Sequence, residues 1–208
     1  MITVWPKIWQ AAVRYGRSGG TEEKRMIQEA VKFAERAHRG AVRKGSRIPY
    51  ITHPLEAAVI AASITDDPEV IAAAVLHDVL EDTDVTREEL ELHFGSRVTG
   101  LVKEESEDKT KSWIERKSAT IEHLKTAPRD VKIIVLADKL SNLRCTARDY
   151  FLLGDQIWER FNEKRKELHA WYYDGVAAEL KELSSYPEYK EYVRLCRLVF
   201  HSQGIFPE

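Results

Sequence analysis

The stretch Val75-Leu76-His77-Asp78-Val79-Leu80-Glu81-Asp82-Thr83 sets a histidine and an aspartate side by side within an apolar sequence. In a helix, residues i and i+4 share one face, so a helical reading puts His77 above Glu81 and Asp78 above Asp82. Burying such a stripe of ionisable groups without a partner would cost several kcal/mol per charge. A bound divalent cation is the simplest partner. The stretch therefore predicts a helical protein with a metal site.

The composition is that of a globular protein with little net charge. The chain has 208 residues, a formal net charge of -2 and 43% hydrophobic residues, which is enough for one domain with a sizeable core. Such a small charge gives no field that would attract nucleic acid or an anionic membrane. No apolar stretch approaches the ~20 residues of a membrane span, and the N-terminus does not resemble a signal peptide. Two distant cysteines form neither a disulfide framework nor a zinc motif, so we expect a cytoplasmic protein.

Helical spacing of apolar residues runs through almost the whole chain and predicts an all-α protein. No alternating run bounded by turns suggests a strand. Gly95 is expected to break a helix that begins after Thr86, which forms a capping-box pattern with Glu89. The other expected helices cover residues 22–38, 54–64, a segment from 68 through the His77–Asp78 pair, and residues 113–125, 129–150, 155–173, 176–183 and 188–201.

Three segments of the chain are distinguished by composition. Residues 1–20 carry Trp5 and Trp9 and are interpreted as an appended arm. Residues 21–185 form the predicted body. Residues 186–208 are predicted to form a last helix that packs on the same body.

Two further residues complete a set of metal ligands. His53 lies at a loop-to-helix junction, and Asp138 is an isolated aspartate in an apolar helix. Two imidazoles and two carboxylates suit manganese, iron, zinc or magnesium with positions left for water. Taken singly, each residue has an ordinary structural explanation, such as a bond from Lys139 to Asp138. Their joint occurrence favours one metal site formed by His53, His77, Asp78 and Asp138.

The spacing His-x23-His-Asp-x59-Asp resembles the pattern of the HD metal-dependent phosphohydrolases. Further blocks are similar to the (p)ppGpp hydrolase domain of RelA/SpoT proteins, in particular to the small alarmone hydrolases. Arg43-Lys44-Gly45 followed by Pro49-Tyr50-Ile51-Thr52-His53-Pro54 resembles "RK…PYI.HP", and residues 76–83 resemble "LHD..EDT". Residues 108–117 are similar to "DDKT…ERK", and residues 136–144 to "LADKL.NLR".

This resemblance implies an all-helical HD-domain bundle with one divalent metal ion, usually Mn2+. It implies an enzyme that removes the 3′-pyrophosphate of ppGpp or pppGpp and leaves GDP or GTP. The metal would polarise a phosphoryl oxygen and acidify a water. Glu81 and Asp82 would orient or deprotonate that water, although Glu81 could instead only bond a metal histidine.

The resemblance also implies residues that contact the nucleotide. Arg43 and Lys44 would pack on the guanine base, and Asn142 would reach the ribose. Lys109 and Arg116 would meet the distal phosphates, with a solvated charged surface as the alternative. Further predicted contacts are Arg148, Lys164 and Tyr172.

Several alternatives remain open at this point. An HD phosphatase could act on another nucleotide, such as NADPH or a nucleoside phosphate, with the same metal site. The chain could also be a binding module that has lost catalysis, or a purely structural helical protein. The resemblance leaves open a homodimer and a toxin alarmone synthetase as partner, and it gives no reason to expect nucleic acid or a membrane.

Overall fold

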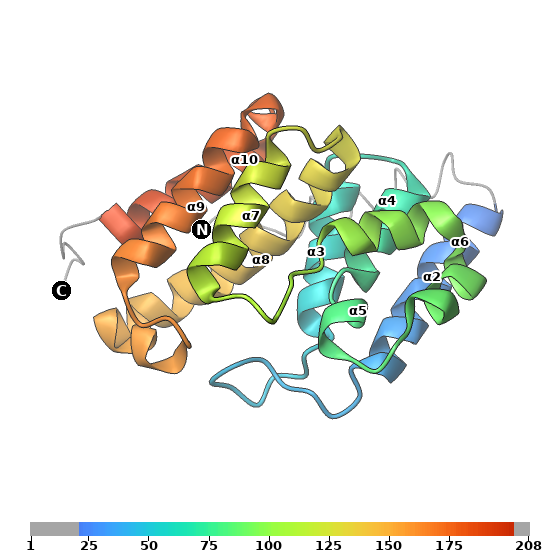
Figure 1. Ribbon diagram of the computed structural model, residues 1–208, viewed down its shortest axis with the longest axis horizontal. Coiled ribbons are helices and arrows are strands. Elements are labelled where there is room, and N and C mark those ends of the chain that lie inside the picture. The colour runs from blue at the N-terminus through green and yellow to red at the C-terminus, as the bar shows by residue number, and fades with distance from the viewer. Residues whose placement is uncertain (1–20, 202–208) are drawn as a thin grey trace. The chain divides into compact units, whose positions relative to one another are not determined.

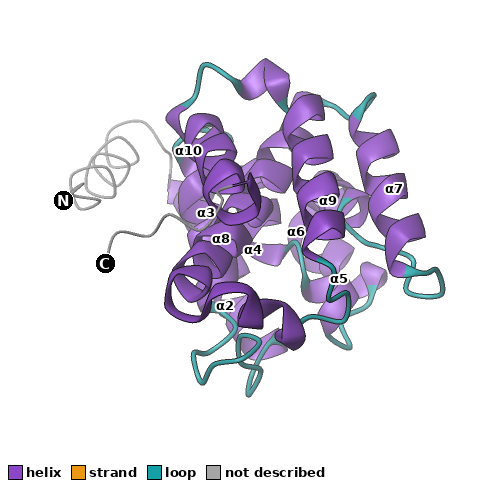
Figure 2. Ribbon diagram, turned by 90° about the vertical axis from the view of Figure 1, so that its left-hand side faces the viewer, coloured by secondary structure: helices purple, strands orange, loops and turns teal. Residues whose placement is uncertain are grey.

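The computed structural model describes residues 21–201, which form helices joined by loops, with no strand in that range (Figure 2). The predicted all-α class is confirmed. Within residues 21–201, β-type backbone pairing is limited to an isolated antiparallel bridge between Val42 and Pro49. No helix of the described range is long and apolar enough to cross a membrane. The predicted arm, residues 1–20, lies outside the described residues.

The contacts divide the described residues into two compact units. The first unit holds residues 21–43 and 47–106, and the second holds residues 44–46 and 107–201. The three predicted segments stay a prediction. Within the second unit, the last α-helix packs on the helices before it.

The first unit is built around one short helix, α4, which is apolar from Val70 onward (Figure 1). Every residue of α4 from Val70 to Leu76 is buried, and α4 packs on α2, α3 and α6. Its start is set locally, because Asp67 accepts hydrogen bonds from the N–H groups of Glu69 and Val70. Pro68 occupies the first turn, where its missing N–H is not needed. The helices are α2 (Thr21–Ala37), α3 (Thr52–Ala62), α4 (Pro68–Leu76), α5 (Val79–Asp82) and α6 (Arg87–Glu104).

The predicted continuous helix through the His77–Asp78 pair is wrong. Helix α4 ends at Leu76, a turn holds His77 and Asp78, and the short helix α5 begins at Val79. Asp78 has φ -94° and ψ -4°, in the region between helix and strand where active-site residues are often found. Its carboxylate bonds the distant Tyr50 rather than capping α5, so a long-range contact replaces helical continuity here.

Helix α6 is kinked where the sequence predicts a break. Gly95 has φ 79° and ψ 170°, a conformation that L-residues rarely adopt. Thr86 accepts a hydrogen bond from the Glu89 N–H, as the capping pattern predicts. Arg97, on the second half of α6, bonds Asp67 and Glu69 and so ties this helix to the start of α4.

The second unit is arranged around the long helix α8. Helix α10 packs on α8 and α9, and α7 packs on α9. Ser112 and Glu115 form a complete capping box at the start of α7. The elements are α7 (Trp113–Leu124), α8 (Arg129–Leu153), the 3-10 helix η1 (Gly154–Arg160), α9 (Lys166–Glu179), the 3-10 helix η2 (Lys181–Leu183), α10 (Pro187–Cys196) and the π-helix η3 (Arg197–His201).

The predicted helix over residues 155–173 is also wrong. The chain forms η1, then a loop over residues 161–165, and only then α9. Trp158 explains the change, because its buried ring stacks on His169 and Phe200 at centroid distances of 5.1 and 5.8 Å. Its indole N–H also donates to Asp155 over 3.1 Å. Burial of this one large side chain outweighs the local helical pattern.

Two glycines of α6 make a matched test of the kink. We expect Gly95→Ala to destabilise the protein by about 1–3 kcal/mol, because alanine is strained at this φ and ψ although the space around it is open. Gly100 is exposed, has helical backbone and has no atom within 4 Å of an added Cβ. Gly100→Ala should therefore stabilise by about 0.5–1 kcal/mol. Urea unfolding of both variants measures the difference, and equal effects at the two positions would contradict the assignment of the kink.

Candidate metal centre

His77 carries a lone pair toward the centre of the candidate site. Its Nδ1 lies 2.8 Å from the carbonyl oxygen of Ala74, which can only accept, so Nδ1 carries the proton. In the neutral ring, Nε2 is then unprotonated. This Nε2 lies 3.2 Å from Nε2 of His53 and 2.9 Å from Oδ2 of Asp78. The turn after α4 thus places a buried nitrogen of His77 beside the two other candidate ligand atoms, His53 Nε2 and Asp78 Oδ2.

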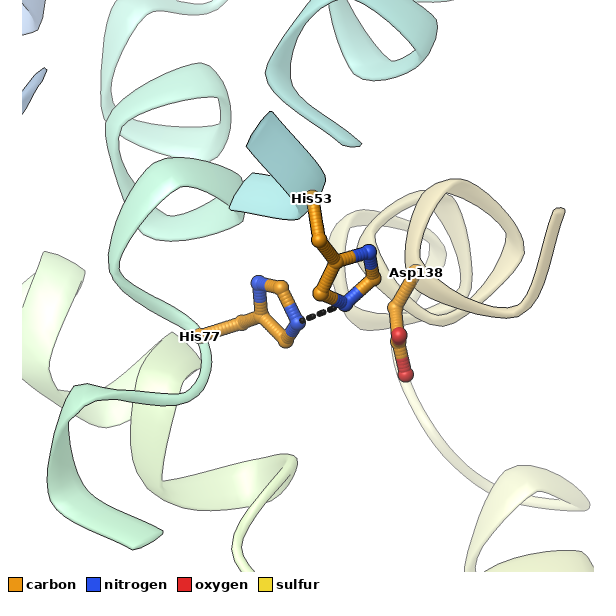
Figure 3. Close-up of side chains that lie close together, drawn as sticks. All are labelled: His53, His77 and Asp138. Atoms are coloured by element: carbon orange, nitrogen blue, oxygen red, sulfur yellow. Dashed lines mark hydrogen bonds between the residues drawn. The ribbon is translucent and has the colours of Figure 1, made fainter. Parts of the chain in front are cut away.

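His53 reaches the same point from the first turn of α3. Its backbone N–H donates to the Tyr50 carbonyl over 2.9 Å, and its ring is 2% exposed. Its Nε2 lies 3.5 Å from Oδ2 of Asp78, and Figure 3 marks its contact with His77 by a dashed line. Two imidazole nitrogens and a carboxylate oxygen therefore converge, and a cation or a shared proton is required to relieve their repulsion.

The Asp78 carboxylate is held by a hydrogen-bond donor from another segment of the first unit. The Tyr50 hydroxyl donates to Oδ2 over 2.5 Å, and the Asp78 side chain is 18% exposed. A carboxylate that accepts a hydrogen bond is favoured in its charged form, which is the form that binds a metal.

Asp138 has its own polar surroundings in the second unit. It is buried on α8, one of the three buried candidate ligands drawn in Figure 3 with His53 and His77. The Asn142 amide donates to its Oδ1 over 2.6 Å, and the Lys139 ammonium contacts its Oδ2. These two donors stabilise the charged form of Asp138, and they explain why an aspartate is tolerated in this apolar helix.

A second cluster of charged side chains lies in the same unit. Glu107 accepts hydrogen bonds from Lys117 over 2.6 Å and from Arg116 over 2.9 Å. Lys117 also lies 4.9 Å above the Tyr172 ring. Burial, together with the positive charge of Lys139, lowers the pKa of Lys117. Burial opposes the charge of Glu107, but the attraction of the surrounding cations outweighs it and lowers the Glu107 pKa. We call Glu107, Arg116 and Lys117 the Glu107 cluster.

The two predicted acid–base residues lie on α5. Glu81 is half-buried and Asp82 is exposed. The backbone N–H groups of both point back to the Asp78 carbonyl, at 3.2 and 2.9 Å. They therefore follow a candidate metal ligand within one turn, and their catalytic role stays a prediction.

Some of the predicted nucleotide contacts lie within the polar clusters. Asn142 bonds Asp138, and Arg116 belongs to the Glu107 cluster. Tyr172 is buried against Lys117. Lys44 lies 5.6 Å from the Phe161 ring and bonds Asn162 over 3.4 Å. Their contact with a nucleotide stays a prediction.

Other predicted contacts lie on the surface or in loops. Arg148 pairs with Asp149 and has a half-exposed side chain. Lys164 pairs with Glu159 and is more exposed still. Lys109 is exposed in the loop before α7, and Arg43 is half-buried beside the bridge that closes the loop before His53.

Tyr50, His38 and Lys117 contact the polar clusters although no sequence pattern predicted a role for them. Tyr50 and Lys117 stand inside quoted motifs, so the signal was available, but no local pattern reveals their long-range partners. His38 is 5% exposed, and its ring centroid lies 4.9 Å from that of Tyr50. A histidine at the end of an apolar helical face could have been singled out as a buried polar group.

A family model and several characterised proteins match this chain. The model of the HD domain family matches residues 30–165. The guanosine-3′,5′-bis(diphosphate) 3′-pyrophosphohydrolase MESH1 of Xenopus tropicalis is 46% identical over 123 residues, which are 57% of this chain and 68% of that protein.

Two solved structures have the same fold. One belongs to a metazoan ortholog of SpoT that hydrolyses ppGpp; it has a TM-score of 0.68 and 29% identity, over 86% of this chain and 96% of that one. The other is lmo0812 of Listeria monocytogenes, with a TM-score of 0.67 and 34% identity over 72% and 99% of the two chains.

The Glu107 cluster gives a prediction about stability. Glu107→Gln leaves the Lys117 ammonium mostly buried without a countercharge, so we expect a loss of about 2 kcal/mol at pH 7. In a Lys117→Met background the same substitution should cost less, because only the Arg116 guanidinium then loses its countercharge. Urea unfolding of the four proteins provides the double-mutant cycle.

The same pair fixes the sign of a pH effect. Because the pKa of Glu107 is below its ordinary value of 4.5 in the folded protein, its stabilisation is present above that value and is lost as the pH falls through the folded pKa. The difference between wild type and Glu107→Gln should therefore be smaller at pH 3 than at pH 7. A difference that grows on acidification would contradict the ion pair.

Proposed function

Because the chain belongs to the HD domain family, we propose that it is a metal-dependent hydrolase that removes the 3′-pyrophosphate of guanosine-3′,5′-bis(diphosphate). The products are GDP, or GTP from the pentaphosphate, and pyrophosphate. The MESH1 relatives carry the name of this activity, and the metazoan ortholog of SpoT is described as hydrolysing ppGpp.

One observation of the structure carries the metal dependence. Nε2 of His77, Nε2 of His53 and Oδ2 of Asp78 lie within 3.5 Å of one another. The bond from His77 Nδ1 to Ala74 leaves the other ring nitrogen to bind a cation. A set of nitrogen and oxygen donors without sulfur fits a divalent ion of the manganese, iron, zinc or magnesium type.

Four residues are proposed to hold the ion: His53, His77, Asp78 and Asp138. Asp138 is supported by its burial and by the two donors, Asn142 and Lys139, that keep it charged. We propose Mn2+ as the ion, on the resemblance of the motifs to those of the small alarmone hydrolases. When bound, it supplies a Lewis acid for phosphoryl oxygens and lowers the pKa of a water.

The chain's own residues orient and activate that water. Glu81 and Asp82 are proposed to take up its proton, and their position one turn after Asp78 supports this role. No nucleophilic side chain is needed, because water itself would attack the phosphorus bound to the 3′ oxygen. The bond between that phosphorus and the 3′ oxygen would break, the 3′ oxygen would take up a proton as it leaves, and pyrophosphate would be released with the oxygen of the water. We also propose a reducing, cytoplasmic setting, in keeping with the two free thiols of Cys145 and Cys196.

Cationic and aromatic side chains are proposed to bind the nucleotide. Lys44 beside Phe161 supports a site for a flat base, since a ring and a cation can both contact its face. The Glu107 cluster, with Tyr172 against Lys117, supports a site for phosphates. Arg43, Lys109, Asn142, Arg148 and Lys164 complete the proposed contacts.

The experiment is a hydrolysis assay with ppGpp, NADPH and nucleoside phosphates, with and without Mn2+. We expect pyrophosphate release from ppGpp that chelation abolishes and added Mn2+ restores. Asp78→Asn should reduce kcat/KM by at least about 100-fold while the protein stays folded, because a metal ligand is lost. Asp66→Asn is the matched control, an exposed aspartate of the same unit, and should leave activity unchanged.

Two results would contradict the proposal. Hydrolysis of NADPH while ppGpp stays intact would favour an HD phosphatase that acts on a different nucleotide. Binding of ppGpp without turnover, in Mn2+ and at several pH values, would indicate a binding module.

A further inference from the structure

Tyr50 is hydrogen-bonded through both its backbone and its hydroxyl group beside the candidate metal centre. Its backbone N–H donates to the Ala41 carbonyl over 2.9 Å, next to the bridge between Val42 and Pro49. Its own carbonyl accepts from the His53 N–H over 2.9 Å. The Tyr50 backbone is therefore fixed by a hydrogen bond at its N–H and another at its carbonyl. These two bonds hold the Tyr50 side chain in one place at the end of the loop that precedes α3.

The Tyr50 hydroxyl is bound to one particular oxygen. It donates to Oδ2 of Asp78 over 2.5 Å, and this is the oxygen that lies 2.9 Å from Nε2 of His77 and 3.5 Å from Nε2 of His53. A carboxylate oxygen offers more than one lone pair, so this bond leaves acceptor capacity for a cation. It also fixes the rotation of the carboxylate about its last bond.

The Tyr50 ring is held in turn by two histidines. Its centroid lies 4.9 Å from that of His38 and 5.8 Å, edge on, from that of His53. His38 is 5% exposed, and its Nε2 has no hydrogen-bond partner among the described residues. The contact of His38 with Tyr50 is thus a packing contact of a buried ring, which keeps the phenol hydroxyl directed at Asp78.

We propose that Tyr50 is a positioning residue of the metal centre, which orients Asp78 for coordination, and that His38 supports it by packing on its ring. This inference rests on the metal site of the proposed function. Partners that hydrogen-bond a metal ligand orient it and raise its affinity, and their loss typically weakens binding by about 10- to 100-fold. Tyr50 does not contact the reacting atoms in this scheme, so its effect must pass through metal binding.

The test is the affinity of the full chain for Mn2+, measured by calorimetry on wild type and Tyr50→Phe. We expect Tyr50→Phe to bind Mn2+ about 10- to 100-fold more weakly, with little change in the thermal stability of the metal-free protein. Its kcat with ppGpp should return to the wild-type value at saturating Mn2+. The matched control is Tyr189→Phe, which removes a hydroxyl that donates to the Ala177 carbonyl over 2.8 Å and should leave Mn2+ affinity unchanged.

A double-mutant cycle separates the two proposed residues. His38→Gln should weaken Mn2+ binding in the wild-type background and have no further effect in Tyr50→Phe, because it acts through the hydroxyl. His38→Gln also keeps the inference testable if Tyr50→Phe does not fold.

Three results would overturn the inference, each in a distinct way. Unchanged or tighter Mn2+ binding in Tyr50→Phe would mean that the hydroxyl is neutral or competes with the metal. A kcat that stays low at saturating Mn2+ would place Tyr50 in the chemistry itself. A wild-type protein that binds no divalent ion would overturn both this inference and the metal site, whereas the first two results leave the proposed hydrolase intact.

Discussion

The arrangement of the first unit depends on holding three acceptor atoms close together. His77 Nε2, His53 Nε2 and Asp78 Oδ2 repel one another unless a cation or a proton lies between them. The surrounding structure supplies the constraint, since the carbonyl of Ala74 fixes one ring and the hydroxyl of Tyr50 fixes the carboxylate. The buried, apolar residues 70–76 of helix α4 give these groups a rigid base. Such a site lowers the stability of the metal-free fold and is typical of function rather than of packing.

Much of the fold could be predicted because its signals are local. The first helix, the start of α4 at Pro68 and the kink at Gly95 all follow from spacing, capping and backbone preference. The all-α class was predicted from helical spacing and is confirmed by the described residues. The HD family was predicted from motifs that hold their order along the chain, and the family match confirms it. These features need no knowledge of which distant residues meet.

The errors have the opposite cause. The helix was predicted to continue through His77 and Asp78 because the apolar spacing continues, but the bond from Tyr50 to Asp78 gives the carboxylate a partner from another element. The helix over residues 155–173 failed because burial of Trp158 outweighs the local pattern. Tyr50 was passed over for the same reason, because its partner Asp78 lies 28 residues further along the chain. The partner of Lys117 lies ten residues before it, across a loop that no helical spacing describes. Sequence patterns therefore predicted candidate site residues without predicting the side chains that hold them in place.

Each unit holds its candidate ligands with hydrogen-bond partners of its own. In the first unit, Ala74 and Tyr50 lie within the unit that contributes His77 and Asp78. In the second, Asn142 and Lys139 lie one turn and one residue from Asp138 on α8. These bonds are internal to each unit, and they orient the side chains of His77, Asp78 and Asp138 without a bound ion. Ligand side chains that are already oriented lose little conformational freedom when a metal binds. This lowers the entropic cost of binding and favours a high affinity with a small number of residues.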